Sequence, residues 1–77
     1  MKNENRNIAR IFIFCRESLG VSQRRMAVLL GVNQSSISRI EKGEIYPRKR
    51  LIERLENQMK QDLNQIILKA MSAAQLS

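Results

Sequence analysis

The chain has 77 residues, of which 43% are hydrophobic and 27% are charged, and its net charge is +7. This length is enough for one small domain and too short for two, since compact domains run from about 50 residues upward. Histidine is absent and Cys15 is the single cysteine, which excludes an intrachain disulfide and a zinc site of ordinary composition. We expect no metal and no cofactor. The sequence shows no paired carboxylates, activated nucleophile or glycine-rich phosphate loop, so we do not expect an enzyme.

The apolar run from Ile8 to Cys15 bears on the cellular compartment. It is interrupted by Arg10 and is too short for a secretory leader or a membrane span. One unpaired cysteine also fits a reducing environment. We therefore expect a cytoplasmic protein that does not interact with a membrane.

The positive charge is concentrated in one part of the chain. Residues 1–50 hold eleven basic and four acidic side chains, whereas residues 51–77 hold three of each. A concentrated positive field is typical of a protein with a polyanionic partner, and a membrane surface or an acidic protein fits less well. A surface that is merely kept soluble by its charge is the plain alternative, and composition alone does not separate the two.

Residues 1–7 are polar and are expected to form a flexible basic arm before the first helix. The next residues place an apolar stripe at helical spacing, and Gly20 is expected to end that helix. The stripe consists of Ile8, Ile11, Phe12, Cys15 and Leu19. A strand over residues 11–14 would find no partner elsewhere in the sequence, so a helix is favoured.

Two short helices are predicted next. Ser22 is suited to cap the first, whose buried face would be Met26, Ala27 and Leu30, with Gly31 as its end. The second begins near Asn33 or Gln34, buries Ile37 and Ile40, and ends at Gly43.

Pro47 fits a position at or just before the start of the next helix, and residues 48–74 contain no helix breaker. This segment predicts either one long helix or two collinear helices with a bend near residues 60–64. All predicted elements are helices, so the expected fold class is all-α.

The two short helices carry the features that point to a function. Two helices joined by a tight glycine-containing turn fit the major groove of DNA when the second helix presents side chains with paired donors and acceptors. The outward face of the second helix offers Gln34, Ser35, Ser38 and Arg39. On an isolated helix, such a face would more often be simply solvated.

Arg24 and Arg25 favour the first interpretation. They stand in the first turn of their helix, where the partial positive charge of the helix dipole disfavours cations. A phosphate bound at that end would meet free N–H groups, the dipole and both guanidinium groups. We therefore expect these arginines to contact phosphate.

Several runs of this sequence are similar to a known family. They are Leu-Gly-Val-Ser-Gln at residues 19–23, Met-Ala at residues 26–27, Leu-Gly-Val-Asn-Gln-Ser-Ser-Ile-Ser-Arg-Ile-Glu-Lys-Gly at residues 30–43, and Pro47. They resemble the helix-turn-helix of the phage Cro and C1 repressor family, also called the XRE-type family, over about residues 8–59. The resemblance implies a five-helix, repressor-like domain that binds double-stranded operator DNA as a homodimer and regulates transcription.

The resemblance also implies roles for single residues. From it we expect the DNA base contacts to be Gln23, Gln34, Ser35, Ser38 and Arg39. Ser22, Asn33, Lys42 and Arg48 match positions that hold the phosphate backbone, a set to which the helix-dipole argument adds Arg24 and Arg25. Arg16 and Glu41 match a structural ion pair.

The sequence departs from the family pattern at several places. The family usually has acidic residues at the positions of Arg24 and Arg25, and polar residues at the positions of Ile13, Phe14, Val28 and Leu29. After Met59 no clear match remains. We expect the C-terminal extension, residues 60–77, to complete the core and form a dimer interface. The candidate interface residues are Met59, Leu63, Ile66, Ile67, Ala70 and Met71. The alternative is an interaction module, such as an antitoxin or anti-repressor, whose C-terminal helix binds a second protein.

Overall fold

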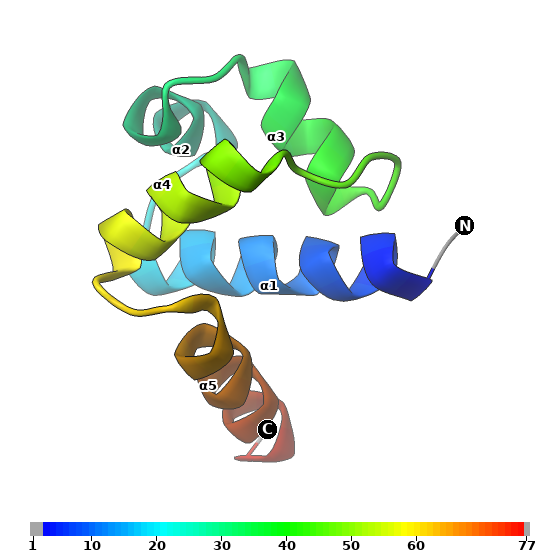
Figure 1. Cartoon of the computed structure of the whole chain (residues 1–77), viewed down its shortest axis with the longest axis vertical. Helices are drawn as coiled ribbons and strands as arrows, with labels where there is room; N and C mark the ends of the chain where they lie inside the picture. Colours follow the sequence, from blue (N-terminus) through cyan, green and yellow to red (C-terminus); the bar gives the residue numbers. More distant parts are fainter. Residues whose placement is uncertain (1–2, 77) are drawn as a thin grey trace.

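The computed structural model of the chain describes residues 3–76, and within that range it contains five α-helices and no strand. The helices are α1 (Asn3–Leu19), α2 (Gln23–Leu30), α3 (Gln34–Glu41), α4 (Lys49–Met59) and α5 (Leu63–Leu76). The predicted all-α class is confirmed. In Figure 1, α1 crosses the middle of the molecule, with α2 and α3 on one side of it and α5 on the other.

The core lies where the apolar stripes of the five helices meet. Its fully buried side chains come from every helix, and they are Phe12, Cys15, Met26, Leu30, Ile37, Ile40, Leu55 and Ile66. The residues predicted to be buried on the two short helices all lie in the core cluster. So does the stripe predicted on the first helix, except that Leu19 is partly buried and packs against the cluster. The packing fixes α3 against α1, and α2 against α3 and α4, which is what positions the outer faces of α2 and α3.

The structure corrects the expected N-terminal arm. Helix α1 begins at Asn3, so residues 3–7 are helical, and only Met1 and Lys2 of the expected arm lie outside the described residues. No glycine or proline interrupts this segment, and Ile8 and Ala9 are buried immediately after it. The Asn5 side chain also donates a hydrogen bond of 3.4 Å to the carbonyl oxygen of Gly43.

The segment after Pro47 forms two helices. Helix α4 ends at Met59, and Lys60 takes a left-handed backbone conformation with φ of 56°. Helix α5 then begins at Leu63 and packs against α1 and α4. The change of direction carries Ile66 into the core, where it is fully buried.

Candidate nucleic-acid interface

The turn between α2 and α3 has the geometry that the sequence predicts. Ser22 caps α2, because its hydroxyl accepts a hydrogen bond of 3.1 Å from the backbone N–H of Arg25. Gly31 ends the helix with φ of 68°, and the N–H of Val32 donates to the carbonyl oxygen of Ala27 at 2.9 Å. This left-handed glycine cap turns the chain sharply into the next helix. The two helices therefore pack at a fixed angle.

The outer face of α3 is the exposed face that the sequence predicts. Gln34, Ser35 and Arg39 are exposed, and Ser38 is half-buried beside them. On the opposite side of the helix, Ile37 and Ile40 are buried in the core. Asn33 stands at the N-cap position without a side-chain cap hydrogen bond, so its amide is not used to hold the helix end.

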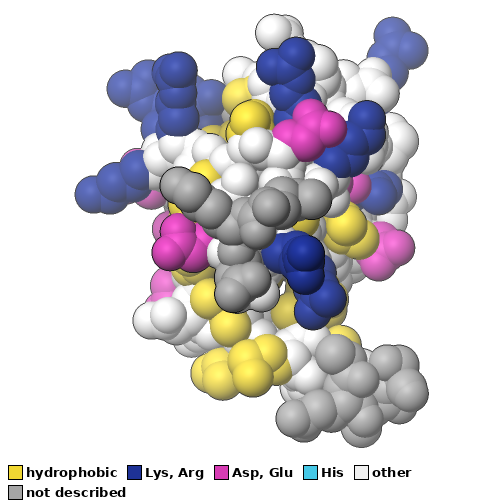
Figure 2. Space-filling model, turned by 90° about the vertical axis from the view of Figure 1, so that its right-hand side faces the viewer, with side chains coloured by type: hydrophobic (Ala, Val, Ile, Leu, Met, Phe, Trp, Pro, Cys, Tyr) yellow, Lys and Arg dark blue, Asp and Glu magenta, His cyan; other side chains and the backbone are white. Residues whose placement is uncertain are grey.

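Exposed basic side chains occur on α2 and in the segment between α3 and α4. The residues assigned above to phosphate, Arg24, Arg25, Lys42 and Arg48, are all exposed in the structure. Figure 2 shows most of the lysine and arginine side chains of that view over its upper half, away from the end formed by α5. The candidate base-reading residues Gln34, Ser35 and Arg39 and the candidate phosphate contacts are thus accessible from solvent, as binding to a polyanion requires.

The expected ion pair between Arg16 and Glu41 is present and is bidentate. Arg16 Nε donates to Glu41 Oε2 at 2.8 Å, and Arg16 Nη2 donates to Oε1 at 3.2 Å. Arg16 Nη1 also donates to the carbonyl oxygen of Val21 at 3.1 Å. The hydrogen bond to Glu41 raises the pKa of the guanidinium above its usual value. The pair links α1, the turn before α2, and the end of α3.

Gln23 joins this pair, which the sequence reasoning did not foresee. Its Nε2 donates to Glu41 Oε1 at 3.0 Å, and the side chain is half-buried. The candidate base contact at the start of α2 is therefore already held by a residue of α3. The two positions are 18 residues apart, so no local sequence signal predicts their contact.

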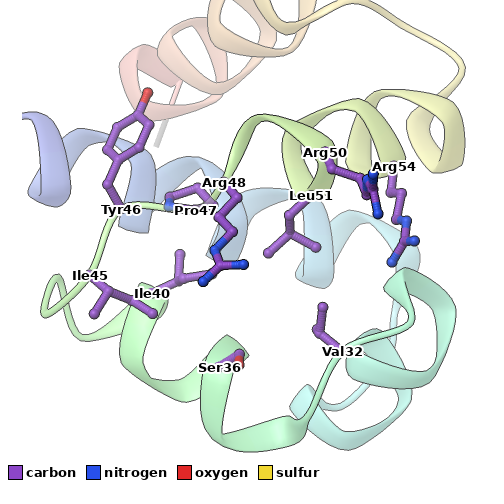
Figure 3. A pocket seen from close by; sticks show the side chains of 10 residues that line it. All are labelled: Val32, Ser36, Ile40, Ile45, Tyr46, Pro47, Arg48, Arg50, Leu51 and Arg54. Atoms are coloured by element: carbon purple, nitrogen blue, oxygen red, sulfur yellow. The ribbon is translucent and has the colours of Figure 1, made fainter.

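A groove runs beside α3, between that helix and the first part of α4 (Figure 3). Its volume is about 400 Å³, and its lining includes the half-buried Ser36 and the arginines Arg48, Arg50 and Arg54. Figure 3 shows the Arg48 side chain pointing into the groove. Arg54 has a structural task, since its Nη1 donates to the carbonyl oxygen of Leu30 at the end of α2 at 3.0 Å.

The expected dimer residues differ in how far they are buried. Ile66 is fully buried within one chain, so the structure corrects its assignment from an interface residue to a core residue. Met59, Leu63 and Ile67 pack against the core from its edge, and Ala70 is half-buried. Met71 is 57% exposed, and Leu68 beside it, which was not among the expected interface residues, is 66% exposed.

The four apolar residues that depart from the family pattern differ in how far they are exposed. Phe14 packs against the core, and Ile13 is half-buried on the same helix. Leu29 is half-buried, whereas Val28 is 65% exposed. Of these four, Val28 alone leaves a large apolar side chain mostly in water.

Within residues 3–76, no helix is long and apolar enough to cross a membrane. The same residues hold no group of three or more histidine, cysteine, aspartate or glutamate side chains placed to bind a metal ion.

The helices α2 and α3, the glycine turn between them and the exposed face of α3 define the class of this small all-α protein. Comparison with known families agrees with that class. A family model described as helix-turn-helix matches residues 14–73, and the chain belongs to this family, which is the XRE or Cro and C1 type that the sequence resembles.

One curated relative gives a second comparison. It comes from Haemophilus influenzae and is named an uncharacterized HTH-type transcriptional regulator. The two sequences are 40% identical over 50 residues, which is 62% of this chain and 51% of the relative. The chain thus spans about half the length of that relative. No solved structure matches the chain.

Proposed function

We propose that this protein is a repressor-like transcriptional regulator that binds a specific double-stranded DNA sequence as a homodimer. The observation that carries the proposal is the exposed face of α3, where Gln34, Ser35 and Arg39 stand free while the opposite face is anchored in the core. Glutamine and arginine offer the paired donors and acceptors that read base edges in the major groove. Membership of the helix-turn-helix family and the name of the H. influenzae relative support the same function.

Phosphate contacts would supply most of the affinity. In this proposal, the exposed Arg24, Arg25, Lys42 and Arg48 bind the backbone on either side of the base-reading helix. If each subunit neutralises about four phosphates, the logarithm of the binding constant falls against the logarithm of the salt concentration with a slope of about −7 for a dimer.

A homodimer would place two copies of α3 in successive major grooves about 34 Å apart on a pseudo-palindromic site. The exposed part of α5, with Met71 and Leu68, supports this assembly, because burying it would remove apolar surface from water. Deleting residues 61–77 is not a clean test, since it would also remove Ile66 from the core. Met71→Glu changes the exposed face alone.

The experiment is selection of bound fragments from a random duplex library, followed by titration of the selected site and of random DNA. We expect Gln34→Ala to cost about 1–3 kcal/mol on the selected site and little on random DNA. Arg24→Ala should weaken both alike, because a phosphate contact carries no sequence information. Equal losses for Gln34→Ala on both duplexes contradict its role in reading bases.

Sedimentation of the full chain, with and without Met71→Glu, tests the homodimer. A monomeric variant with weakened binding to the selected site supports the proposed assembly. If Met71→Glu leaves binding intact but releases a different protein that copurifies with the wild-type chain, α5 is instead the docking face of an interaction module.

A further inference from the structure

The carboxylate of Glu41 is where α1, α2 and α3 meet. One of its oxygens accepts from Arg16 Nε at 2.8 Å, and the other accepts from Arg16 Nη2 at 3.2 Å and from Gln23 Nε2 at 3.0 Å. The Glu41 side chain is only 6% exposed. This carboxylate is therefore held by three donors from two helices, with little access to water.

This arrangement determines which way the amide of Gln23 points. An ionised carboxylate only accepts hydrogen bonds, and a glutamine amide has a donor nitrogen and an acceptor oxygen. The reverse orientation would set the Gln23 carbonyl oxygen against an oxygen of Glu41 and leave both without a donor between them. Arg16 strengthens the constraint, because its two hydrogen bonds hold the carboxylate in place.

The fixed orientation limits what Gln23 can offer to a ligand. Its nitrogen retains one N–H, and its carbonyl oxygen remains free to accept. Gln23 is the first residue of α2, it is half-buried, and its partner Glu41 is the last residue of α3. The free acceptor thus belongs to a side chain that is tied to the helix proposed to read bases.

We propose that Glu41, held by Arg16, is a positioning residue that locks the Gln23 amide with its nitrogen inward and thereby sets the base preference of Gln23. This inference rests on the proposed DNA binding. With its oxygen free, Gln23 matches a base whose major-groove edge carries a donor, such as adenine N6 or cytosine N4. Guanine offers only acceptors at that edge and gives the outward oxygen no donor, so it is the disfavoured base.

Glu41→Gln tests this assignment. A glutamine at position 41 can keep its oxygen on Arg16 Nε and turn its nitrogen toward Gln23, which then reverses its own amide. The bond from Arg16 Nη2 is lost in this variant, because an amide nitrogen does not accept it. The position that Gln23 reads is the one whose preference disappears in Gln23→Ala. There, we expect Glu41→Gln to lower discrimination against guanine about tenfold, because the reversed amide turns its nitrogen toward the guanine acceptors.

Arg16→Lys is the matched control. It replaces the two-point fork with a single charged group but leaves the Glu41 carboxylate available to Gln23. We expect a lower melting temperature for this variant, with base preference unchanged to within about twofold. If Arg16→Lys changes the preference as much as Glu41→Gln does, Glu41 acts through general scaffold stability and the proposal is wrong.

A double-mutant cycle separates positioning from direct contact. If Glu41 acts through Gln23, Glu41→Gln has no effect on base preference in the Gln23→Ala background, although it still lowers stability. An effect of the same size in both backgrounds overturns the proposal. A wild-type chain that selects no duplex sequence at all would instead refute the proposed function.

The orientation can also be measured in the free wild-type protein, which covers the case of variants that do not fold. Side-chain amide protons of Gln23 should exchange with water more slowly than those of the exposed Gln34, and a coupling across the hydrogen bond should link Gln23 Nε2 to the Glu41 carboxylate. Equal, fast exchange of both amides would overturn the proposal whether or not DNA binding is found.

Discussion

The carboxylate of Glu56 accepts a hydrogen bond of 2.6 Å from the backbone N–H of Leu63, so a side chain of α4 caps the first turn of α5. Asp62 and Gln65 form a reciprocal cap at the same place. The N–H of Gln65 donates to Asp62 Oδ1 at 2.9 Å, and the N–H of Asp62 donates to Gln65 Oε1 at 3.4 Å. These caps satisfy N–H groups that a helix start leaves unpaired, which explains why residues 48–74 form two helices without a glycine or proline between them.

Removing the Glu56 cap should destabilise the protein. We expect Glu56→Ala to lower the free energy of unfolding by about 1 kcal/mol, because the N–H of Leu63 loses its acceptor. For a domain of this size, that loss corresponds to a melting temperature lower by roughly 4–8 °C. Glu53→Ala, an exposed site on the same helix, is the control, and thermal unfolding that shifts equally for both variants contradicts the capping role.

Lys60 has an unfavourable backbone conformation at the break between α4 and α5. Its φ of 56° is the one positive φ among the non-glycine residues that the structure describes, and a side chain in this region is disfavoured by about 1–2 kcal/mol. Because glycine adopts the left-handed conformation freely, Lys60→Gly should raise the free energy of unfolding by about 0.5–1 kcal/mol. Lys69→Gly, in the middle of α5, should lower it by about 1 kcal/mol. Denaturant titration of both variants checks the contrast in sign.

Local signals in the sequence predict much of this fold. Ser22 caps α2 and Gly31 ends it, as expected, because both effects depend on the chemistry of one residue and its neighbours. The buried positions Ile37 and Ile40 follow equally from helical spacing. Helix boundaries that lack such markers are harder to predict, and α1 accordingly begins at Asn3 and not at Ile8.

Contacts between distant residues account for what the sequence does not predict. The resemblance to the family supplies the Arg16–Glu41 pair, but the third partner, Gln23, becomes visible only when α2 and α3 are packed. Ile66 lies on the same apolar stripe as its neighbours, and only the turn at Lys60 decides that it enters the core of its own chain. Periodicity gives the buried side of a helix, but not the element that covers it.

Gly31 should tolerate substitution less well than Gly20, although their φ angles of 68° and 69° are nearly the same. A Cβ at Gly31 would lie 3.0 Å from Arg54 Nη1, whereas a Cβ at Gly20 meets nothing within 4 Å. Both alanine substitutions force a side chain into the left-handed backbone region, which lowers the free energy of unfolding. Gly31→Ala should lower it by about 0.5–1.5 kcal/mol more, because the new Cβ displaces the hydrogen bond from Arg54 to the carbonyl oxygen of Leu30.

Denaturant titration of the two alanine variants measures that difference. In an Arg54→Ala background the obstructing guanidinium is gone, so the two glycine substitutions should then cost nearly the same. If Gly31→Ala still lowers the free energy of unfolding more than Gly20→Ala does in the Arg54→Ala background, the arginine is not the cause of the difference.

Cys15 should make stability depend on alkaline pH. Burial raises the pKa of its thiol from 9.0 to about 11. As the pH rises past 9, the unfolded chain releases this proton first, and the equilibrium moves toward the unfolded state. The stabilising contribution of the neutral thiol is complete below about pH 9 and is lost as the pH approaches about 11.

The test compares the free energy of unfolding of the wild-type chain with that of Cys15→Ala, at neutral pH and at about pH 11. The difference between the two proteins should be smaller at the higher pH. All other side chains are the same in both proteins and cancel in this comparison, so a constant difference would show that the buried thiol does not couple its ionisation to folding.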